Sequence, residues 1–196
     1  MTPPSVGYGI RILSTGSAIP DKLLTNADLE QMMDTSDEWI QQRTGIKHRH
    51  MSDQSKGEGT VSLAIDAAED AFKKSGLDPS DLDLIICATC TQEMTCPSVA
   101  CRISERIGTK DIPAFDLAAA CSGFLYSLNF AESLIKSGRF NTVLVVGADA
   151  MTTVMDYTDR SVSILFGDAA GAAIITRTDN PDQGCLHQIM GADGNG

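Results

Sequence analysis

Apolar residues recur at helical spacing in some segments of the chain and form nearly continuous runs in others. Within Thr60–Ser75 they recur every three or four residues and Gly76 follows, which predicts a helix that ends there. Residues 84–89 form a nearly continuous apolar run, typical of a strand buried on both faces in a parallel sheet. Similar runs predict strands at residues 10–13, 113–117, 142–146, 163–166, 171–176 and 186–190.

A capping signal near the N-terminus places the single tryptophan on a short helix. Ser36 is a good N-cap, and Gly45 suits the left-handed residue that closes a helix. Trp39 and Arg43 lie four residues apart inside this helix, so we expect them to share one face.

Other helices are expected at residues 26–33, from Pro97 as first helical residue to Gly108, and from Cys121 to Gly138. Strands and helices alternate early, and strands alone close the chain. The sequence therefore predicts one α/β layer with a mixed sheet and no internal linker.

Charge and composition exclude several classes of protein. The chain has 196 residues, of which 42% are hydrophobic, and a net charge of -11, so it resembles a folded domain and lacks the basic surface of a nucleic-acid binder. No apolar stretch approaches the roughly 18 to 20 residues of a membrane span, and residues 1–6 do not resemble a secretory signal. Six cysteines are few for a disulfide scaffold. We therefore expect a cytoplasmic protein with no membrane or nucleic-acid partner.

The sharpest chemical feature is Cys121, placed where a strand turns into a helix among small residues. A helix N-terminus offers free N–H groups and a partial positive charge, which favour a thiolate and can stabilise an oxyanion. Cys121 is therefore a candidate nucleophile. Spacing alone equally allows a small residue that fills a crowded turn.

The other cysteines do not form a convincing metal site. Cys87 and Cys90 have the spacing of a zinc or redox pair, and Cys96 and Cys101 follow. Cys87 lies in a predicted strand, where residues three apart point to opposite faces. We expect small buried hydrophobes here, and neither a metal nor a cofactor.

Several motifs besides the cysteine turn occur in order along the chain, and together they carry a family resemblance that covers nearly all of it. They are Gly16-Ser17 with Pro20, Thr25-Asn26-Ala27-Asp28-Leu29, Asp34-Thr35-Ser36-Asp37-Glu38-Trp39-Ile40, Arg43-Thr44-Gly45-Ile46, Pro97-Ser98, Ala120-Cys121-Ser122-Gly123-Phe124, Val145-Val146-Gly147-Ala148-Asp149, Thr158-Asp159-Arg160 and Phe166-Gly167-Asp168-Ala169-Ala170-Gly171-Ala172. The chain resembles the beta-ketoacyl-acyl carrier protein synthase III enzymes of the thiolase superfamily. The resemblance implies that residues 1–196 form the N-terminal half of a thiolase-like α/β fold.

The resemblance also implies a reaction that initiates type II fatty-acid synthesis. Cys121 would accept the acyl group of an acyl-CoA primer such as acetyl-CoA, and malonyl-acyl carrier protein would then decarboxylate and attack it, giving a 3-ketoacyl thioester. A homodimer is also implied.

Four residues match the family's coenzyme A site. Trp39 and Arg160 would sandwich the adenine, and Thr35 and Arg43 would contact the nucleotide. An aromatic face opposite a guanidinium suits base stacking, in agreement with the roles that the resemblance gives these residues.

The resemblance places a catalytic His and Asn in a homologous C-terminal half that this chain lacks. The histidines present, His48, His50 and His187, fall outside the matching motifs, so none is expected to be a general base. Without the second half, we expect acylation of Cys121 but no condensation.

Smaller features leave alternatives open. The basic residues 47–50 would either attract coenzyme A phosphates or form a solvated loop. Cys96 precedes Pro97 where family members often carry an aromatic residue, so a longer or branched primer would fit. A related condensing enzyme with another acyl substrate, or a non-catalytic scaffold, are the alternative functions.

Overall fold

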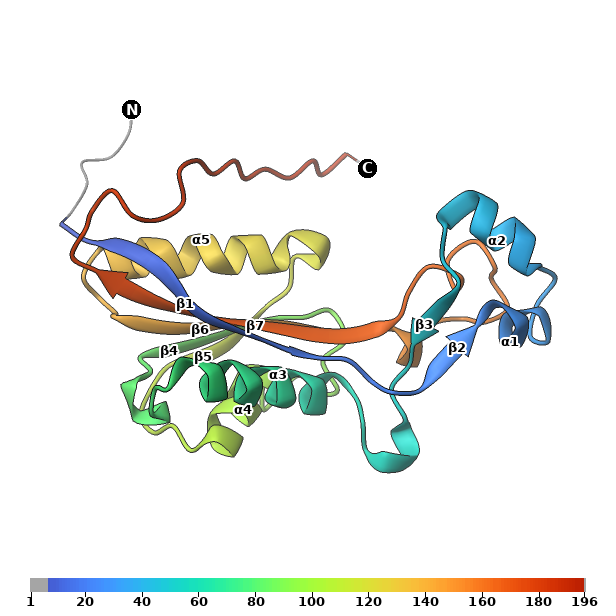
Figure 1. Cartoon of the computed structure of the whole chain (residues 1–196), viewed down its shortest axis with the longest axis horizontal. Helices are drawn as coiled ribbons and strands as arrows, with labels where there is room; N and C mark the ends of the chain where they lie inside the picture. Colours follow the sequence, from blue (N-terminus) through green and yellow to red (C-terminus); the bar gives the residue numbers. More distant parts are fainter. Residues whose placement is uncertain (1–6, 196) are drawn as a thin grey trace.

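A five-stranded mixed sheet forms the centre of the computed structural model, which describes residues 7–195 (Figure 1). In the order β1-β7-β6-β4-β5, its strands are β1 (Gly9–Ala18), β7 (Asp168–Thr178), β6 (Thr142–Ala150), β4 (Leu84–Ala88) and β5 (Ala114–Leu117). β4 runs parallel to β5 and β6, whereas β7 is antiparallel to β6 and β1. The predicted mixed sheet is confirmed. Residues 1–6, on which the expectation about a secretory signal rests, lie outside the described residues.

Helices cover both faces of this sheet. α3 (Thr60–Ser75) and α4 (Val99–Ile107) pack on one face, and α5 (Gly123–Lys136) packs on the other (Figure 1). Successive side chains of a strand point to opposite faces of the sheet. Ile85 packs in the core on the face covered by α3 and α4, and Ile86 packs in the core on the face covered by α5. Burial on both sides explains why β4 reads as a continuous apolar run.

A small lobe, residues 20–53 and 151–167, extends from one end of the main sheet (Figure 1). It contains β2 (Leu23–Thr25), α1 (Asn26–Glu30), α2 (Asp37–Thr44) and β3 (His48–His50), and β2 pairs antiparallel with β3. Its own core is formed by Leu24, Leu29, Ile40 and Ile164. The lobe thus has a hydrophobic centre separate from those of the main sheet.

Local capping signals are confirmed at several helix ends. The Ser36 hydroxyl accepts a hydrogen bond from the Trp39 N–H at 3.1 Å, and Gly45 closes α2 with φ of 74°. α3 ends at Gly76 as predicted. Thr25 caps α1, but that helix ends at Glu30, earlier than expected. None of the helices among the described residues is long and apolar enough to span a membrane.

Three further expectations about these elements are wrong. Pro97 precedes α4, because Ser98 is the N-cap and its hydroxyl accepts from the Cys101 N–H. Residues 163–166 form a turn with local backbone bonds, and Ile164 is buried in the lobe core. Residues 186–190 form neither helix nor strand, and Leu186 is 95% exposed. A short apolar run does not by itself predict a strand, because its burial depends on a partner strand that the sequence does not identify.

Candidate active site

Cys121 lies on a tight turn that joins β5 to α5. A single 3-10 turn, Ala120–Ser122, leads into α5, and the Cys121 side chain is exposed. Ala120 has φ of 44°, a left-handed conformation that non-glycine residues seldom adopt and that recurs at functional sites. The cysteine is therefore presented at the start of a helix, as the sequence predicted.

The backbone of Gly123, two residues after Cys121, packs closely against the end of β4. A Cβ atom on Gly123 would lie 3.1 Å from the Cβ of Ala88 at the end of β4. The first turn of α5 is thereby pressed against the sheet. This contact fixes how closely the turn of Cys121 approaches the carboxyl end of β4.

The carboxyl ends of the parallel strands meet at the edge that faces the small lobe (Figure 1). In α/β sheets ligands bind outside these ends. At this edge Asp149 of β6 accepts hydrogen bonds through Oδ1 from Cys90 N–H at 2.8 Å, Thr91 Oγ1 at 2.9 Å and Thr89 Oγ1 at 3.2 Å. One carboxylate thus fixes the start of the loop that leaves β4.

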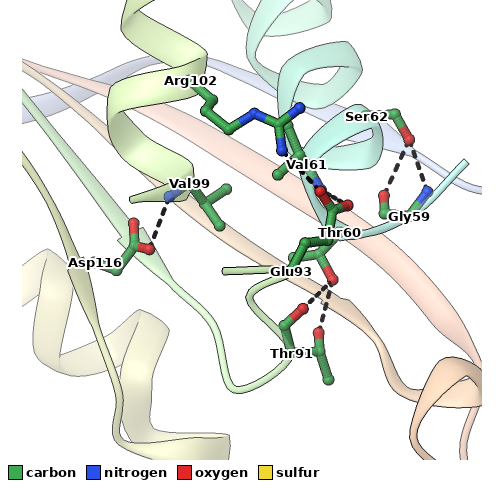
Figure 2. Close-up of polar contacts among 9 residues, drawn as sticks. All are labelled: Gly59, Thr60, Val61, Ser62, Thr91, Glu93, Val99, Arg102 and Asp116. Carbon is green, nitrogen blue, oxygen red and sulfur yellow. Dashed lines mark hydrogen bonds and ion pairs between the residues drawn. The ribbon is translucent and has the colours of Figure 1, made fainter. Parts of the chain in front are cut away.

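The remainder of this loop is tied to α3 and α4 (Figure 2). Thr60 donates through Oγ1 to the Thr91 carbonyl at 2.8 Å, and Glu93 accepts from the Val61 N–H at 3.2 Å. The other oxygen of Glu93 pairs with Arg102 at 2.8 Å. These contacts hold the segment that leads to Cys96, which is exposed.

Asp116 on β5 anchors the far end of the same loop. Its two oxygens accept from the N–H groups of Val99 and Ala100, at 2.8 and 2.9 Å, in the first turn of α4. Figure 2 shows the contact with Val99. A carboxylate in that position satisfies helix donors and matches the positive end of the helix dipole. The strand that precedes Cys121 is therefore joined to the loop that carries Cys96.

The residues predicted to bind a nucleotide come together on the small lobe. The guanidinium carbon of Arg43 lies 4.7 Å from the Trp39 ring centroid, and that of Arg160 lies 5.1 Å from it. Arg160 also donates to the Asp34 carbonyl at 2.6 Å. Thr35, the next residue, has a buried hydroxyl that lacks a hydrogen-bond partner among the described residues. An indole flanked by two guanidinium groups is a platform for a planar base with phosphates.

Cys87, His48 and His50 lie on strands and not on the turn that carries Cys121. Cys87 is fully buried in β4, where burial, followed by the neighbouring Asp116 and Asp149, raises the pKa of its thiol. No cluster with the composition of a metal site occurs within residues 7–195. His48 and His50 lie on β3, and the Nδ1 of His50 is 2.6 Å from the Pro20 carbonyl oxygen. Cys87 is therefore a buried hydrophobe as expected, but that expectation is wrong for Cys90, Cys96 and Cys101, which are exposed.

Sequence reasoning missed two polar residues that organise these regions, Asp149 and Arg49. Arg49 belongs to the basic residues 47–50, for which a phosphate contact or a solvated loop was expected. Both expectations are wrong for Arg49, because it is 3% exposed and points into the lobe. In β3 the side chains alternate, so that His48 is exposed and Arg49 is buried, and the residue types of this short segment gave no signal of it.

Comparisons with known proteins agree with this geometry. The family model 3-Oxoacyl-[acyl-carrier-protein (ACP)] synthase III matches residues 115–194. The chain is 50% identical over 184 residues to Beta-ketoacyl-[acyl-carrier-protein] synthase III 1 of Vibrio parahaemolyticus, covering 94% of this chain and 57% of that protein. It is 48% identical over 182 residues to the synthase III of a Sulfurovum species, covering 92% and 53%.

Solved structures show the same relationship. 3-Oxoacyl-[acyl-carrier-protein] synthase III from Aquifex aeolicus superposes with a TM-score of 0.84 at 46% identity, covering 88% of this chain and 55% of that one. A priming beta-ketosynthase from a polyketide biosynthetic pathway gives 0.83 at 36% identity, covering 88% and 51%. The predicted thiolase-like α/β fold is confirmed. The chain spans about half the length of the curated relatives it matches, and over that length it is similar to proteins named beta-ketoacyl-[acyl-carrier-protein] synthase III.

Proposed function

We propose that this chain is the N-terminal half of an acyltransferase that initiates fatty-acid synthesis by decarboxylative condensation. In the first step the Cys121 thiolate attacks the thioester carbonyl of an acyl-CoA. The carbon–sulfur bond to coenzyme A breaks, and coenzyme A leaves as its thiol after taking up a proton. The product is an acyl-Cys121 thioester.

In the second step malonyl-acyl carrier protein supplies the nucleophile. Its carboxylate leaves as carbon dioxide, and the electron pair of the broken bond forms an enolate that attacks the acyl-Cys121 carbonyl. The Cys121 thiolate departs, leaving a 3-ketoacyl thioester on the carrier protein. The His and Asn that stabilise the enolate in the family would come from a homologous C-terminal half.

The observation that carries this proposal is the position of Cys121. It lies at the start of α5, at the carboxyl edge of the parallel strands that faces the small lobe, and α2 of that lobe carries Trp39. The nucleotide of the acyl-CoA would stack on Trp39 beside Arg43 and Arg160, and Thr35 would donate its free hydroxyl to it.

The exposed face of α5 supports the proposal of a second half. Leu125 and Phe130 are 66% and 51% exposed, although they belong to a helix whose other face packs on the sheet. A hollow of about 750 Å³ lies between α5, β1 and residues 183–191. An apolar face of this kind is covered when a homologous half-fold packs against it.

The test is acyl transfer to the chain itself. Incubation with acetyl-CoA is expected to add one acetyl group, detected by intact mass and located on Cys121 by peptide mapping. Cys121→Ser should abolish the stable adduct while the thermal midpoint stays unchanged. Cys101→Ser, which removes another exposed thiol, is the matched control and should acetylate normally. Full acetylation of Cys121→Ser would refute the nucleophile assignment.

A second candidate is a related condensing enzyme with another acyl substrate. It is favoured by the likeness to the priming beta-ketosynthase and by the small Cys96 at the loop before α4. Comparing acetyl, branched and longer acyl-CoA donors in the acylation assay separates the candidates. Preference for a longer donor would favour the second.

The partners of this proposal are acyl-CoA, malonyl-acyl carrier protein and a second copy of the chain. β5 is the terminal strand of the main sheet, and Phe115 on it is 41% exposed. Pairing of two β5 edges would give a homodimer, which light scattering after size-exclusion chromatography tests. A cytoplasmic location is part of the same proposal.

A further inference from the structure

Arg49 of β3 is a buried cation without an acidic partner. It is 3% exposed, and none of the ion pairs found within residues 7–195 involves it. Burying a charge is costly, and a methionine of similar length would fill the same space without that cost. The guanidinium must therefore do something that an apolar side chain would not.

Its hydrogen bonds join two segments that are far apart in the sequence. Arg49 donates through Nε to the Ile164 carbonyl at 2.9 Å, and a second nitrogen donates to the same oxygen. The remaining terminal nitrogen donates to Asn26 Oδ1 at 2.5 Å. A planar guanidinium can serve both acceptors at once because its donors are fixed in a fork.

One end of this bridge leads to Trp39. The amide nitrogen of Asn26 donates to Asp37 Oδ1 at 2.7 Å and to the Ile46 carbonyl at 2.8 Å. Asp37 is the first residue of α2 and Ile46 follows its last turn. Asn26 thus forms hydrogen bonds at both ends of the helix that carries Trp39.

The other end of the bridge leads to Arg160. Ile164 belongs to a turn in which the Ser163 N–H donates to the Asp159 carbonyl at 3.2 Å. Arg160 is the residue after Asp159. A Cβ atom on Gly167 would lie 3.2 Å from the Cβ of Arg49, so this segment also packs directly against β3.

We propose that Arg49 is a positioning residue that sets the distance and orientation between Trp39 and Arg160, which lie in direct contact here and would separate to take the adenine of coenzyme A between them. This inference rests on the proposed function for its ligand. Arg49 touches neither the base nor the reacting atoms and acts through Asn26 and Ile164.

The test uses Trp39, the only tryptophan in the chain, as a reporter. Coenzyme A is titrated into the wild type, Arg49→Lys, Arg49→Met and the control Arg177→Lys, an exposed arginine on β7, while Trp39 emission is recorded. A lysine reaches one of the two acceptors, so Arg49→Lys should keep its far-UV circular dichroism but raise the dissociation constant about tenfold. Arg49→Met should weaken binding further and shift the ligand-free emission to longer wavelength.

The outcomes are distinguishable. If Arg49→Lys matches Arg177→Lys in both the dissociation constant and the ligand-free emission, the positioning role is overturned. If the wild type does not bind coenzyme A, the proposed function fails at this site, and the ligand-free emission of Arg49→Met still decides whether Arg49 positions Trp39.

Discussion

The main sheet and the small lobe are held together in different ways. Under Cys121, buried strands are covered on both faces by helices, and apolar contacts hold the strands from which the turn of Cys121 projects. The lobe buries far fewer apolar residues and relies on polar bridges such as those of Asn26 and Arg49. A directional hydrogen bond specifies geometry where little apolar area is available, whereas packing supplies stability where it is plentiful.

This difference suits the two tasks we propose. A nucleophile needs a fixed position relative to the strand ends, and Gly123 against Ala88 provides it. A nucleotide slot must admit and release a ligand, so its sides come from separate segments joined by bridges. The two regions should therefore respond differently to perturbation.

The largest expected effect comes from a cavity in the main sheet. Leu144 on β6 is fully buried against the α3 side, so Leu144→Ala should lower the free energy of unfolding by about 2 to 5 kcal/mol. Because both regions depend on this sheet, circular dichroism and Trp39 emission should shift together in urea titrations. Leu186→Ala, at a position 95% exposed, should leave the free energy of unfolding within about 0.5 kcal/mol of the wild type. A Trp39 transition unaffected by Leu144→Ala would show that the lobe folds independently.

The sequence predicted the main sheet better than the lobe for a physical reason. Caps such as Ser36 and apolar runs such as residues 84–89 are local signals, so helix ends and buried strands can be predicted without knowing the partners. The bond from Arg49 to Ile164 spans 115 positions, and no local pattern predicts it. The same lack of partner information made residues 186–190 resemble a strand.

The candidate site follows the same division. Cys121 and the Trp39 helix could be assigned from their own neighbourhoods and from the family motifs. The roles of Asp149 and Arg49 depend on tertiary hydrogen bonds between distant segments. These residues were therefore found only when the strand ends and the lobe were placed in space.

A middle-sized effect is expected at the junction between the regions. The buried Asp168 at the start of β7 accepts from the N–H groups of Ser52 and Thr152, both at 2.8 Å, and from Thr152 Oγ1 at 2.6 Å. Asp168→Asn replaces one acceptor oxygen by an amide NH2 group that faces the donors of Ser52 and Thr152. It should therefore lower the free energy of unfolding by about 1 to 3 kcal/mol. Amide exchange at Ser52 and Thr152 should accelerate more than exchange in β4. Asp179→Asn, at an exposed position just after β7, is the control. Unchanged amide exchange at Ser52 in Asp168→Asn would contradict the junction role.

The smallest effect is a difference in acid sensitivity. In the lobe, hydrogen bonds from Thr25 lower the pKa of Asp28, and those from Asn26 and Gln41 lower that of Asp37. Such carboxylates stabilise the fold above their ordinary range near pH 4, and this contribution is lost as the pH falls through their lowered pKa values. In α3, partial burial followed by the nearby Glu69 raises the pKa of Asp66, so protonation there relieves a penalty as the pH falls.

The pKa values are lowered in the lobe and raised in α3, so their effects on stability have opposite signs as the pH falls. Acid should therefore destabilise the lobe before the main sheet. We expect Trp39 emission to change at a higher pH than far-UV circular dichroism when the chain is titrated below pH 4. Asp37→Asn should reduce the pH dependence of Trp39 emission, because it removes one of the titrating groups, whereas Asp66→Asn should leave that signal unchanged. Coincident transitions by both probes would show that the lobe and the sheet unfold in acid as one cooperative unit.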